Sequence, residues 1–292
     1  MTAGGKSREG AVSEGVIAGL LFGTAAIFIR MTPTLDSISI TFWRLIIASV
    51  ALAAILKVKQ VKGFPQLKHN LSRVLLLGIL IGIHFALFIS SVKETSILNA
   101  TVLVNTSPIT TMTVSVLIYG ARPKKISVVG VLISFLGIAM IGVGDASAMD
   151  PGRLIGDAQA ILAAVAEAFY LNLGREIRSR IGLLTIMLPV FGIAGSAVFF
   201  FSFVTGNGPQ IPTAIGILLP LLGLGLLPTA LGHSLYFSSL SNLKPFETAT
   251  LALIEPIGAT ILGAMIFQEF PGLLFIMGSV IVLTGVVLVI KE

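Results

Sequence analysis

Several ionisable or strongly polar residues stand inside long apolar stretches of this sequence: Arg44, His84, Asn105, Glu167, His233 and Glu255. Such side chains are costly in apolar surroundings, so each needs either a bonding partner or a function. A guanidinium can bind a carboxylate through paired hydrogen bonds, and a buried carboxyl group can exchange a proton. No His, Asp and Glu set has metal-ligand spacing, and no Ser-His-Asp arrangement is suggested. The pattern indicates ligand binding or proton movement, with no catalytic residues, no metal and no cofactor.

Arg44 and His84 are the first two candidates for contacting a ligand. Arg44 follows Trp43 and can bind a substrate carboxylate, reach outward to the membrane surface, or cap the carbonyls of neighbouring helices. His84 stands beside Phe85 and one helical turn before Phe88. An imidazole among aromatic rings indicates a cavity wall for a zwitterionic aromatic substrate, with a simple hydrogen bond between helices as the alternative.

The stretch around Asn105 carries polar or kink-forming residues at helical spacing: Thr101, Asn105, Pro108 and Met112. A polar stripe of this kind cannot face lipid, so it must face other protein or water. We therefore predict that Thr101 and Asn105 line the path of a substrate.

Two carboxylates and their aromatic neighbours form the remaining candidates. Tyr170 follows Glu167 by three residues, and Tyr236 follows His233 by three. Tyr170, His233 and Tyr236 are predicted to contact substrate. Glu167 and Glu255 are candidates for coupling substrate movement to a proton, while Glu255 can alternatively hydrogen bond to freed backbone amides.

The composition shows which solvent must surround these residues. Of 292 residues, 55% are hydrophobic and only 11% are charged, with a mean hydropathy of +1.02. Soluble proteins have about 25% charged residues, so most of this chain must lie in a bilayer. A cytosolic enzyme, a DNA-binding domain and a disordered adaptor are excluded. The chain has no cysteine, which excludes disulfides, thiolate catalysis and Cys-ligated metals.

Ten apolar segments of about 20 residues can each cross a bilayer as a helix. They cover 13–30, 36–56, 72–92, 95–119, 124–143, 153–174, 182–204, 212–238, 244–267 and 270–290. The connecting loops leave no room for a nucleotide-binding domain, and no phosphate-binding loop motif occurs. The predicted fold is an all-α polytopic membrane protein that is not driven by ATP.

The basic residues predict the orientation of these segments. With the N-terminus inside, fifteen of the 19 Lys and Arg residues face the cytoplasm: Lys6, Arg8, Lys57, Lys59, Lys62, Lys68, Arg73, Arg122, Lys124, Lys125, Arg175, Arg178, Arg180, Lys244 and Lys291. Only Arg30, Lys93 and Arg153 lie outside, near the acidic Asp145 and Asp150. This bias predicts a cell (inner) membrane protein with both termini cytoplasmic. The net positive charge is then explained by basic loops that face anionic lipid, and no nucleic acid is expected as a partner.

An internal repeat divides the chain into two halves, 1–146 and 147–292. Residues 85–142 align without a gap on 233–290 at an offset of 148, with eleven identities in 58 positions. The matches that define backbone geometry are Pro108 with Pro256, Gly130 with Gly278 and Gly137 with Gly285. Because each half has five spans, the second half must enter the membrane from the opposite side.

The inverted repeat points to transport, since such repeats surround a midplane site in many secondary transporters. Pro108 and Pro256 interrupt equivalent spans in the two halves. A proline within a helix frees a carbonyl and bends the helix, which can line a cavity, although a packed kink is the alternative reading. The matched pair favours the cavity.

Specific runs of residues resemble a known family. The run from Phe22 to Arg30 (FGTAAIFIR), the run TFWRLIIA beginning at Thr41, and the second-half series Glu255-Pro256 to Glu269 resemble the EamA-type members of the drug/metabolite transporter superfamily. Ala121 departs from the family pattern, since it stands where the repeat would place the partner of Glu269. The aromatic-lined spans look most like the YddG-type aromatic amino-acid exporters.

The resemblance implies a secondary transporter that exports aromatic and other amino acids and related small metabolites by alternating access. We expect a broad, mostly apolar central cavity, and a monomer is sufficient for this function. A drug or nucleotide-sugar transporter is the alternative, although a nucleotide sugar would need several basic residues at membrane depth, where Arg44 stands alone. A membrane receptor or an intramembrane enzyme is less favoured, since the sequence shows neither a soluble domain nor a catalytic pair.

Overall fold

The structure is a computed structural model that describes residues 7–60, 65–95, 97–143, 154–206, 208–268 and 271–291. Within these residues every regular element is a helix, and ten spans are long and apolar enough to cross a membrane. The predicted all-helical fold with ten membrane-spanning segments is confirmed. Several residues named above lie outside the described part of the chain: Lys6, Lys62, Asp145, Asp150, Arg153 and Glu269.

The first half contributes five spans and one short helix. Its elements are α1 (Arg8–Arg30), α2 (Ser37–Val58), the short α3 (Pro65–Lys68), α4 (Leu71–Glu94), α5 (Ile97–Val104), α6 (Ser107–Leu117) and α7 (Lys125–Val143). Together α5 and α6 form one interrupted span. Each span is helical because lipid offers no hydrogen bonds to backbone N–H and C=O groups, and a helix pairs these groups within the segment.

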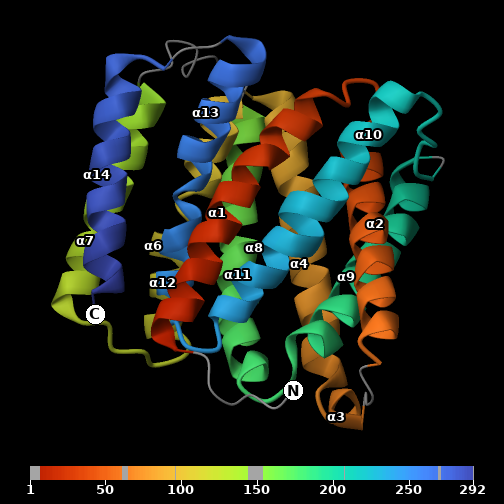
Figure 1. The fold of residues 1–292 in the computed structure, drawn as a ribbon, viewed down its shortest axis with the longest axis horizontal. Helices are drawn as coiled ribbons and strands as arrows, with labels where there is room; N and C mark the ends of the chain where they lie inside the picture. Colours follow the sequence, from red (N-terminus) through yellow and green to blue (C-terminus); the bar gives the residue numbers. More distant parts are fainter. Residues whose placement is uncertain are drawn as a thin grey trace.

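The second half repeats this arrangement with two interrupted spans. Its elements are α8 (Leu154–Arg178), α9 (Leu183–Thr205), α10 (Ile215–Leu224), η2 (Gly225–His233), α11 (Ser234–Ser239), α12 (Pro245–Ala252), α13 (Glu255–Phe267) and α14 (Leu273–Ile290). The π-helix η2 joins α10 to α11 in one span, and α12 with α13 forms the next. Both ends of the chain lie at the lower end of the helices in Figure 1.

The span formed by α5 and α6 and the span formed by α12 and α13 break at equivalent positions. The first break separates α5 from α6 at residues 105–106, and the second separates α12 from α13 at residues 253–254, so the repeat offset of 148 relates them. Pro108 and Pro256 each stand in the first turn of the helix that follows the break. Proline fits there because the first N–H groups of a helix have no partner within it.

The last helices of the two halves, α7 and α14, pack through glycine. A Cβ added at Gly137 would lie 2.7 Å from the Gly278 carbonyl oxygen, and one added at Gly278 would lie 2.7 Å from the Gly137 oxygen. Gly130 meets Gly285 in the same way, at 2.8 and 2.5 Å. Only glycine lets two helix backbones approach this closely.

These contacts have the symmetry of an inverted repeat. The repeat pairs Gly130 with Gly278 and Gly137 with Gly285, so each cross-helix contact is the image of the other. Between them Ser134 donates from its hydroxyl to the carbonyl oxygen of Val282 at 3.3 Å, and these two residues are themselves equivalent. Equivalent residues meet only on a two-fold axis, so this arrangement agrees with the predicted inversion of the two halves.

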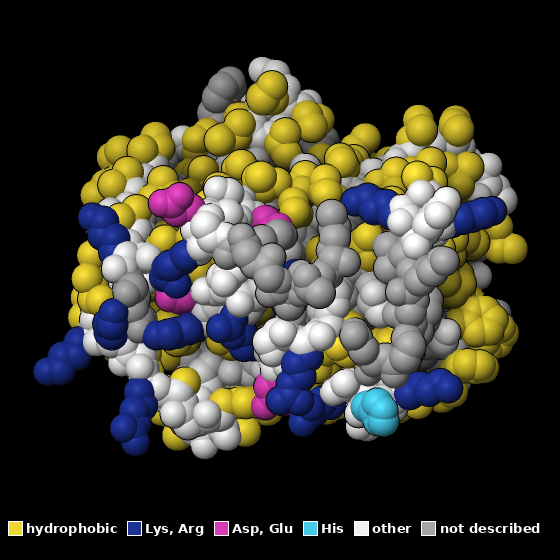
Figure 2. Space-filling model, turned by 60° about the horizontal axis from the view of Figure 1, so that its bottom comes forward, with side chains coloured by type: hydrophobic (Ala, Val, Ile, Leu, Met, Phe, Trp, Pro, Cys, Tyr) yellow, Lys and Arg dark blue, Asp and Glu magenta, His cyan; other side chains and the backbone are white. Residues whose placement is uncertain are grey.

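Basic residues gather at the end that carries both chain termini, and Figure 2 shows this face. Among the described residues it holds Arg8, Lys57, Lys59, Lys68, Arg73, Arg122, Lys124, Lys125, Arg175, Arg178, Arg180, Lys244 and Lys291. Of the described basic residues, only Arg30 and Lys93 end helices at the opposite face. The charge asymmetry found in the sequence is therefore also an asymmetry of the folded molecule.

A partly buried ion pair between Arg8 and Glu247 joins the two halves at this basic end. Arg8 of α1 donates to both carboxylate oxygens of Glu247 in α12, at 2.8 and 3.2 Å. Arg8 also donates to the Ile290 carbonyl oxygen at 3.0 Å, and Glu247 accepts from the Lys244 backbone N–H at 2.6 Å. Because Glu247 is only 1% exposed, these bonds fix α1, α12 and α14 together at the basic face.

The glycine contacts predict a stability difference between two helical glycines. Gly137→Ala should lower the free energy of unfolding by about 1–3 kcal/mol, because the new methyl group meets backbone that cannot move aside. Gly192→Ala in α9 is the matched control, since nothing lies within 4 Å of its Cβ position. Thermal and denaturant unfolding of the purified variants in detergent measures both. Equal stability of Gly137→Ala and Gly192→Ala would contradict the described packing of α7 on α14.

Candidate functional site

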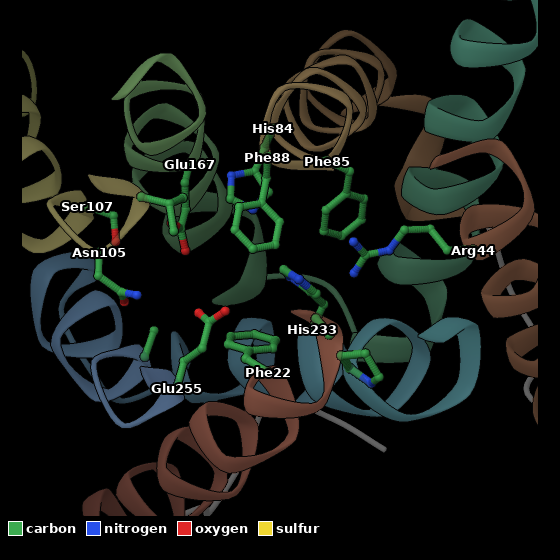
Figure 3. Close-up of a pocket in the computed structure, with 14 residues that line it drawn as sticks. Phe22, Arg44, His84, Phe85, Phe88, Asn105, Ser107, Glu167, His233 and Glu255 are labelled. Carbon is green, nitrogen blue, oxygen red and sulfur yellow. The ribbon is translucent and has the colours of Figure 1, made fainter. Parts of the chain in front are cut away.

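A central cavity lies between the two halves, and both helix breaks border it (Figure 3). Asn105 and Ser107 line it at the first break, and Ala252 and Glu255 line it at the second. The rest of the wall comes from α1, α2, α4, α5, α8 and η2, through Phe22, Ala25, Arg44, His84, Phe85, Phe88, Val104, Glu167, Pro228 and His233. Irregular backbone at membrane depth is tolerated where it faces a cavity, which explains why the breaks meet here.

The cavity is small, and polar residues are as frequent as apolar ones in its lining. Its volume is about 30 Å³, roughly the share of one water molecule in the liquid. Seven of the fourteen lining residues carry polar or ionisable side chains. The cavity is narrower than the broad one that the sequence predicts, and polar side chains of both halves converge in it at the helix breaks. A substrate larger than water needs the surrounding helices to move apart.

Arg44 enters the cavity from α2 with its guanidinium only partly bonded. The residue is 1% exposed, its Nε donates to the Thr229 hydroxyl at 2.9 Å, and its Cζ lies 3.8 Å from the centre of the Phe85 ring. Its Nη1 is buried and has no hydrogen-bond partner. A guanidinium held by a ring face and one acceptor retains the capacity to bind an anion.

The two histidines lie side by side in the wall but are held differently. The Nδ1 of His84 lies 3.0 Å from the Ala163 carbonyl oxygen, and because a carbonyl only accepts, this nitrogen carries the proton. The ring of His233 packs between Phe22 and Phe85, with centroid distances of 4.5 and 4.6 Å, and its Nδ1 has no partner. The repeat offset aligns His233 with Phe85 rather than with His84, which accounts for the different surroundings.

Two carboxylates occupy the opposite part of the cavity. In Figure 3 the carboxyl groups of Glu167, from α8, and Glu255, from α13, point toward one another across it. Glu167 accepts a hydrogen bond from the Tyr236 hydroxyl at 2.8 Å, and the Asn105 side chain hydrogen bonds to Glu255. The site is therefore polarised, with Arg44 on one side and two carboxylates on the other.

Four residues predicted to contact substrate lie outside the cavity wall. The indole Nε1 of Trp43 donates to the Gln210 carbonyl oxygen at 2.8 Å, which directs the ring toward the loop between α9 and α10. Thr101 lies within α5, one turn from the break, and Tyr170 is fully buried in the hydrophobic core. Helical spacing showed that these side chains avoid lipid, but it does not separate a cavity wall from helix packing. Tyr236 also lies behind the wall, where it holds Glu167.

Some lining residues were missed by the sequence prediction, and the repeat contained the signal for one of them. Ser107 is buried and lines the cavity, and the offset of 148 makes it the equivalent of Glu255. Phe22 lies one turn from Gly19 on α1, and a Cβ added at Gly19 would lie 2.6 Å from the Leu251 carbonyl oxygen. The face of α1 that carries Gly19 therefore packs against the second break, and Phe22 lies on the same face, one turn further along, in the cavity wall.

Comparison with known families covers both halves of the chain. The sequence profile of the EamA-like transporter family matches residues 11–143 and again residues 154–291. Two separate matches to one profile agree with the internal repeat and with its boundary between α7 and α8.

Individual relatives match over most of their length. The chain is 25% identical over 281 residues to an uncharacterized transporter of Archaeoglobus fulgidus, which covers 95% of each chain. It is 29% identical to the uncharacterized transporter YdfC of Bacillus subtilis, over 85% of this chain and 79% of that one. A solved crystal structure aligns with a TM-score of 0.80 over 97% of this chain and 96% of its own, at 17% identity. That likeness shows the fold alone.

Proposed function

We propose that this chain, which belongs to the EamA-like transporter family, exports amino acids and related small metabolites by alternating access. Its membership makes it a multi-pass membrane transporter of small molecules, in line with relatives that are named transporters. This role fits a protein that is not an enzyme. The choice of amino acids as substrates goes further, and it is supported by the chemistry of the central cavity.

The observation that carries the proposal is the buried, unpartnered Nη1 of Arg44 at the cavity wall. A buried donor without a partner costs about 1–3 kcal/mol, which a bound carboxylate would recover. His233 presents a second unpartnered nitrogen on the same side. Glu167 and Glu255 offer acceptors for an ammonium group on the other side, so the site is complementary to a zwitterion.

The apolar part of the wall suits the side chain of such a substrate. Phe22, Phe85 and Phe88 lie between the cationic and the acidic sides of the cavity (Figure 3). Aromatic faces pack against both aliphatic and aromatic groups, so they favour several amino acids over one. This lining supports the proposed likeness to the YddG-type aromatic amino-acid exporters.

An organic cation, such as a cationic drug, is the second candidate substrate. Two carboxylates and three phenylalanine rings line the cavity, and this combination binds cations as well as it binds an ammonium group. A nucleotide sugar is disfavoured because Arg44 is the one Lys or Arg side chain among the lining residues. Arg44 separates the two candidates, since a cation without a carboxylate gains nothing from it.

Replacing Arg44 should weaken amino-acid transport selectively. In proteoliposomes we expect flux of several amino acids by the wild type, and Arg44→Gln should raise the KM about tenfold or more because a charge-assisted hydrogen bond is lost. Arg30→Gln is the matched control, since Arg30 is exposed at the end of α1. A lipophilic cation tested in parallel should be unaffected by Arg44→Gln. Cation flux without any amino-acid flux would replace the leading proposal with the second candidate.

We further propose that the basic face is cytoplasmic and that the chain resides in the cell membrane with both termini inside. The support is the gathering of thirteen described Lys and Arg residues at that face, against two at the other. Short loops retained in the cytoplasm carry such an excess. Export then requires the cavity to open first toward the basic face.

The absence of cysteine from the sequence makes this orientation easy to measure. Ser179→Cys places a single thiol at an exposed position of the basic face, and Thr34→Cys places one at an exposed position of the other. We expect a membrane-impermeant maleimide to label Thr34→Cys in intact cells but Ser179→Cys only after permeabilisation. The reverse pattern would show that the termini face outward.

We also propose that transport is coupled to protons through Glu167 and Glu255. The two carboxylates share one small cavity in which like charges repel. Binding of a proton or of a substrate ammonium relieves the same repulsion, so the two can compete for the site. Such competition is a physical basis for exchanging a proton against a substrate.

A substitution at Glu255 distinguishes coupling from simple diffusion through the site. Glu255→Gln keeps the size of the side chain but cannot release a proton, so accumulation driven by a pH gradient should be lost while substrate exchange persists. Glu94→Gln is the control because Glu94 is exposed at the end of α4. Both activities are measured in proteoliposomes with and without an imposed gradient. If the wild-type flux is the same with and without the pH gradient, the proposal of proton coupling is wrong.

A further inference from the structure

The π-helix η2 has no counterpart in the first half of the chain. It covers Gly225–His233, and the repeat offset places residues 77–85 opposite it, within the regular α-helix α4. A wide π turn within an otherwise α-helical span often marks a functional site. The difference therefore needs a cause that is specific to the second half.

Pro228 supplies the first part of that cause. Proline has no N–H, so the carbonyl of Leu224, four residues earlier, loses its α-helical partner. The Thr229 hydroxyl takes this place and donates to the Leu224 oxygen at 2.6 Å. The bond consumes the only hydrogen of the hydroxyl, which leaves the Thr229 oxygen available as an acceptor.

Arg44 is the residue that donates to the Thr229 hydroxyl oxygen. Its Nε donates to the Thr229 oxygen at 2.9 Å, and Thr229 is fully buried. The close approach of η2 to α2 is possible because of Gly225, where a Cβ would lie 2.5 Å from the Ile47 Cγ2 and 3.3 Å from the Arg44 carbonyl oxygen. The π-helix therefore packs against the turn of α2 that carries Arg44.

Two contacts then define the orientation of the guanidinium. Thr229 fixes Nε, and the Phe85 ring, 3.8 Å from Cζ, covers one face of the plane. Since a guanidinium is planar and rigid, fixing one nitrogen and one face determines where the other nitrogens point. The remaining Nη1 is the one that is buried without a partner.

We propose that Thr229 is a positioning residue for substrate recognition, which orients Arg44 so that its Nη1 meets the substrate carboxylate. This inference rests on the proposed function, in which Arg44 binds that carboxylate. Continuing the offset of 148 four residues beyond the aligned block places Ile81 opposite Thr229, and Ile81 has no hydroxyl and belongs to the hydrophobic core. A threonine hydroxyl in this position therefore occurs in one half only, beside the one arginine among the lining residues of the cavity.

Substitution of Thr229 tests the inference through the KM for amino-acid flux in proteoliposomes. Thr229→Val keeps the shape but removes the hydroxyl, and it should raise the KM about five- to tenfold through loss of the oriented bond. Thr229→Ser should restore a KM near that of the wild type. The control is Thr41→Val, because Thr41 is also buried and bonds only to the Ser37 carbonyl oxygen, at 2.7 Å, one turn from Arg44.

A double substitution separates positioning from a general structural effect. In the Arg44→Gln background, Thr229→Val should cause no further rise in KM, because the group that it orients is absent. Fully multiplicative effects of the two changes would overturn the proposal, as would a Thr229→Val KM equal to that of Thr41→Val. If Thr229→Val does not fold in detergent, Thr229→Ala is used with the same criteria.

The same series shows which proposal fails. If Arg44→Gln leaves the KM unchanged, the proposed carboxylate contact is wrong and the positioning role falls with it. If Arg44→Gln raises the KM while Thr229→Val does not, the proposed function stands and the positioning role alone is rejected.

Discussion

The lack of hydrogen-bonding solvent inside a bilayer determines where this molecule can depart from regular helices. The structure breaks its spans at residues 105–106 and 253–254 and widens one at η2, and all three irregularities border the same cavity. Side chains satisfy the backbone there: Asn105 donates to the Thr101 carbonyl oxygen at 2.7 Å, and Thr229 donates to that of Leu224 at 2.6 Å. The polar site and the irregular backbone therefore depend on each other. Polar side chains satisfy the backbone groups that the breaks leave unpaired, and the breaks lie where those side chains face a cavity instead of lipid.

The two halves share a backbone plan but not their chemistry. Their breaks coincide under the repeat, and the glycine contacts of α7 and α14 are images of one another. By contrast, the lining residue His233 has Phe85 as its equivalent, and Glu255 has Ser107. The symmetric backbone provides two related packings of the same helices, whereas the unmatched side chains produce a single polarised site rather than two copies of one.

The fold could be predicted from the sequence because lipid imposes a long apolar run for each span and because prolines and glycines mark the repeat. The site could be predicted only in part. Arg44, His84 and Glu255, which line the cavity, were candidates because ionisable groups are rare at membrane depth. Periodicity shows only that a side chain avoids lipid, so it did not show that Trp43 lies outside the cavity wall. The bond between Thr229 and Arg44 joins residues 185 positions apart in the sequence. No local pattern contains such a bond.

The unpartnered polar atoms in the cavity wall strengthen the case for a ligand. In folded proteins at least about 90% of buried polar groups are hydrogen bonded, so unpartnered ones call for an explanation. Here Arg44 Nη1 and His233 Nδ1 are both unpartnered, and both residues line a cavity of about 30 Å³. A water molecule could occupy that volume, yet a water cannot balance the charge of a guanidinium. A carboxylate accepts from the guanidinium and offsets its charge, so the polar atoms that are costly without a partner are the ones that a zwitterion would satisfy.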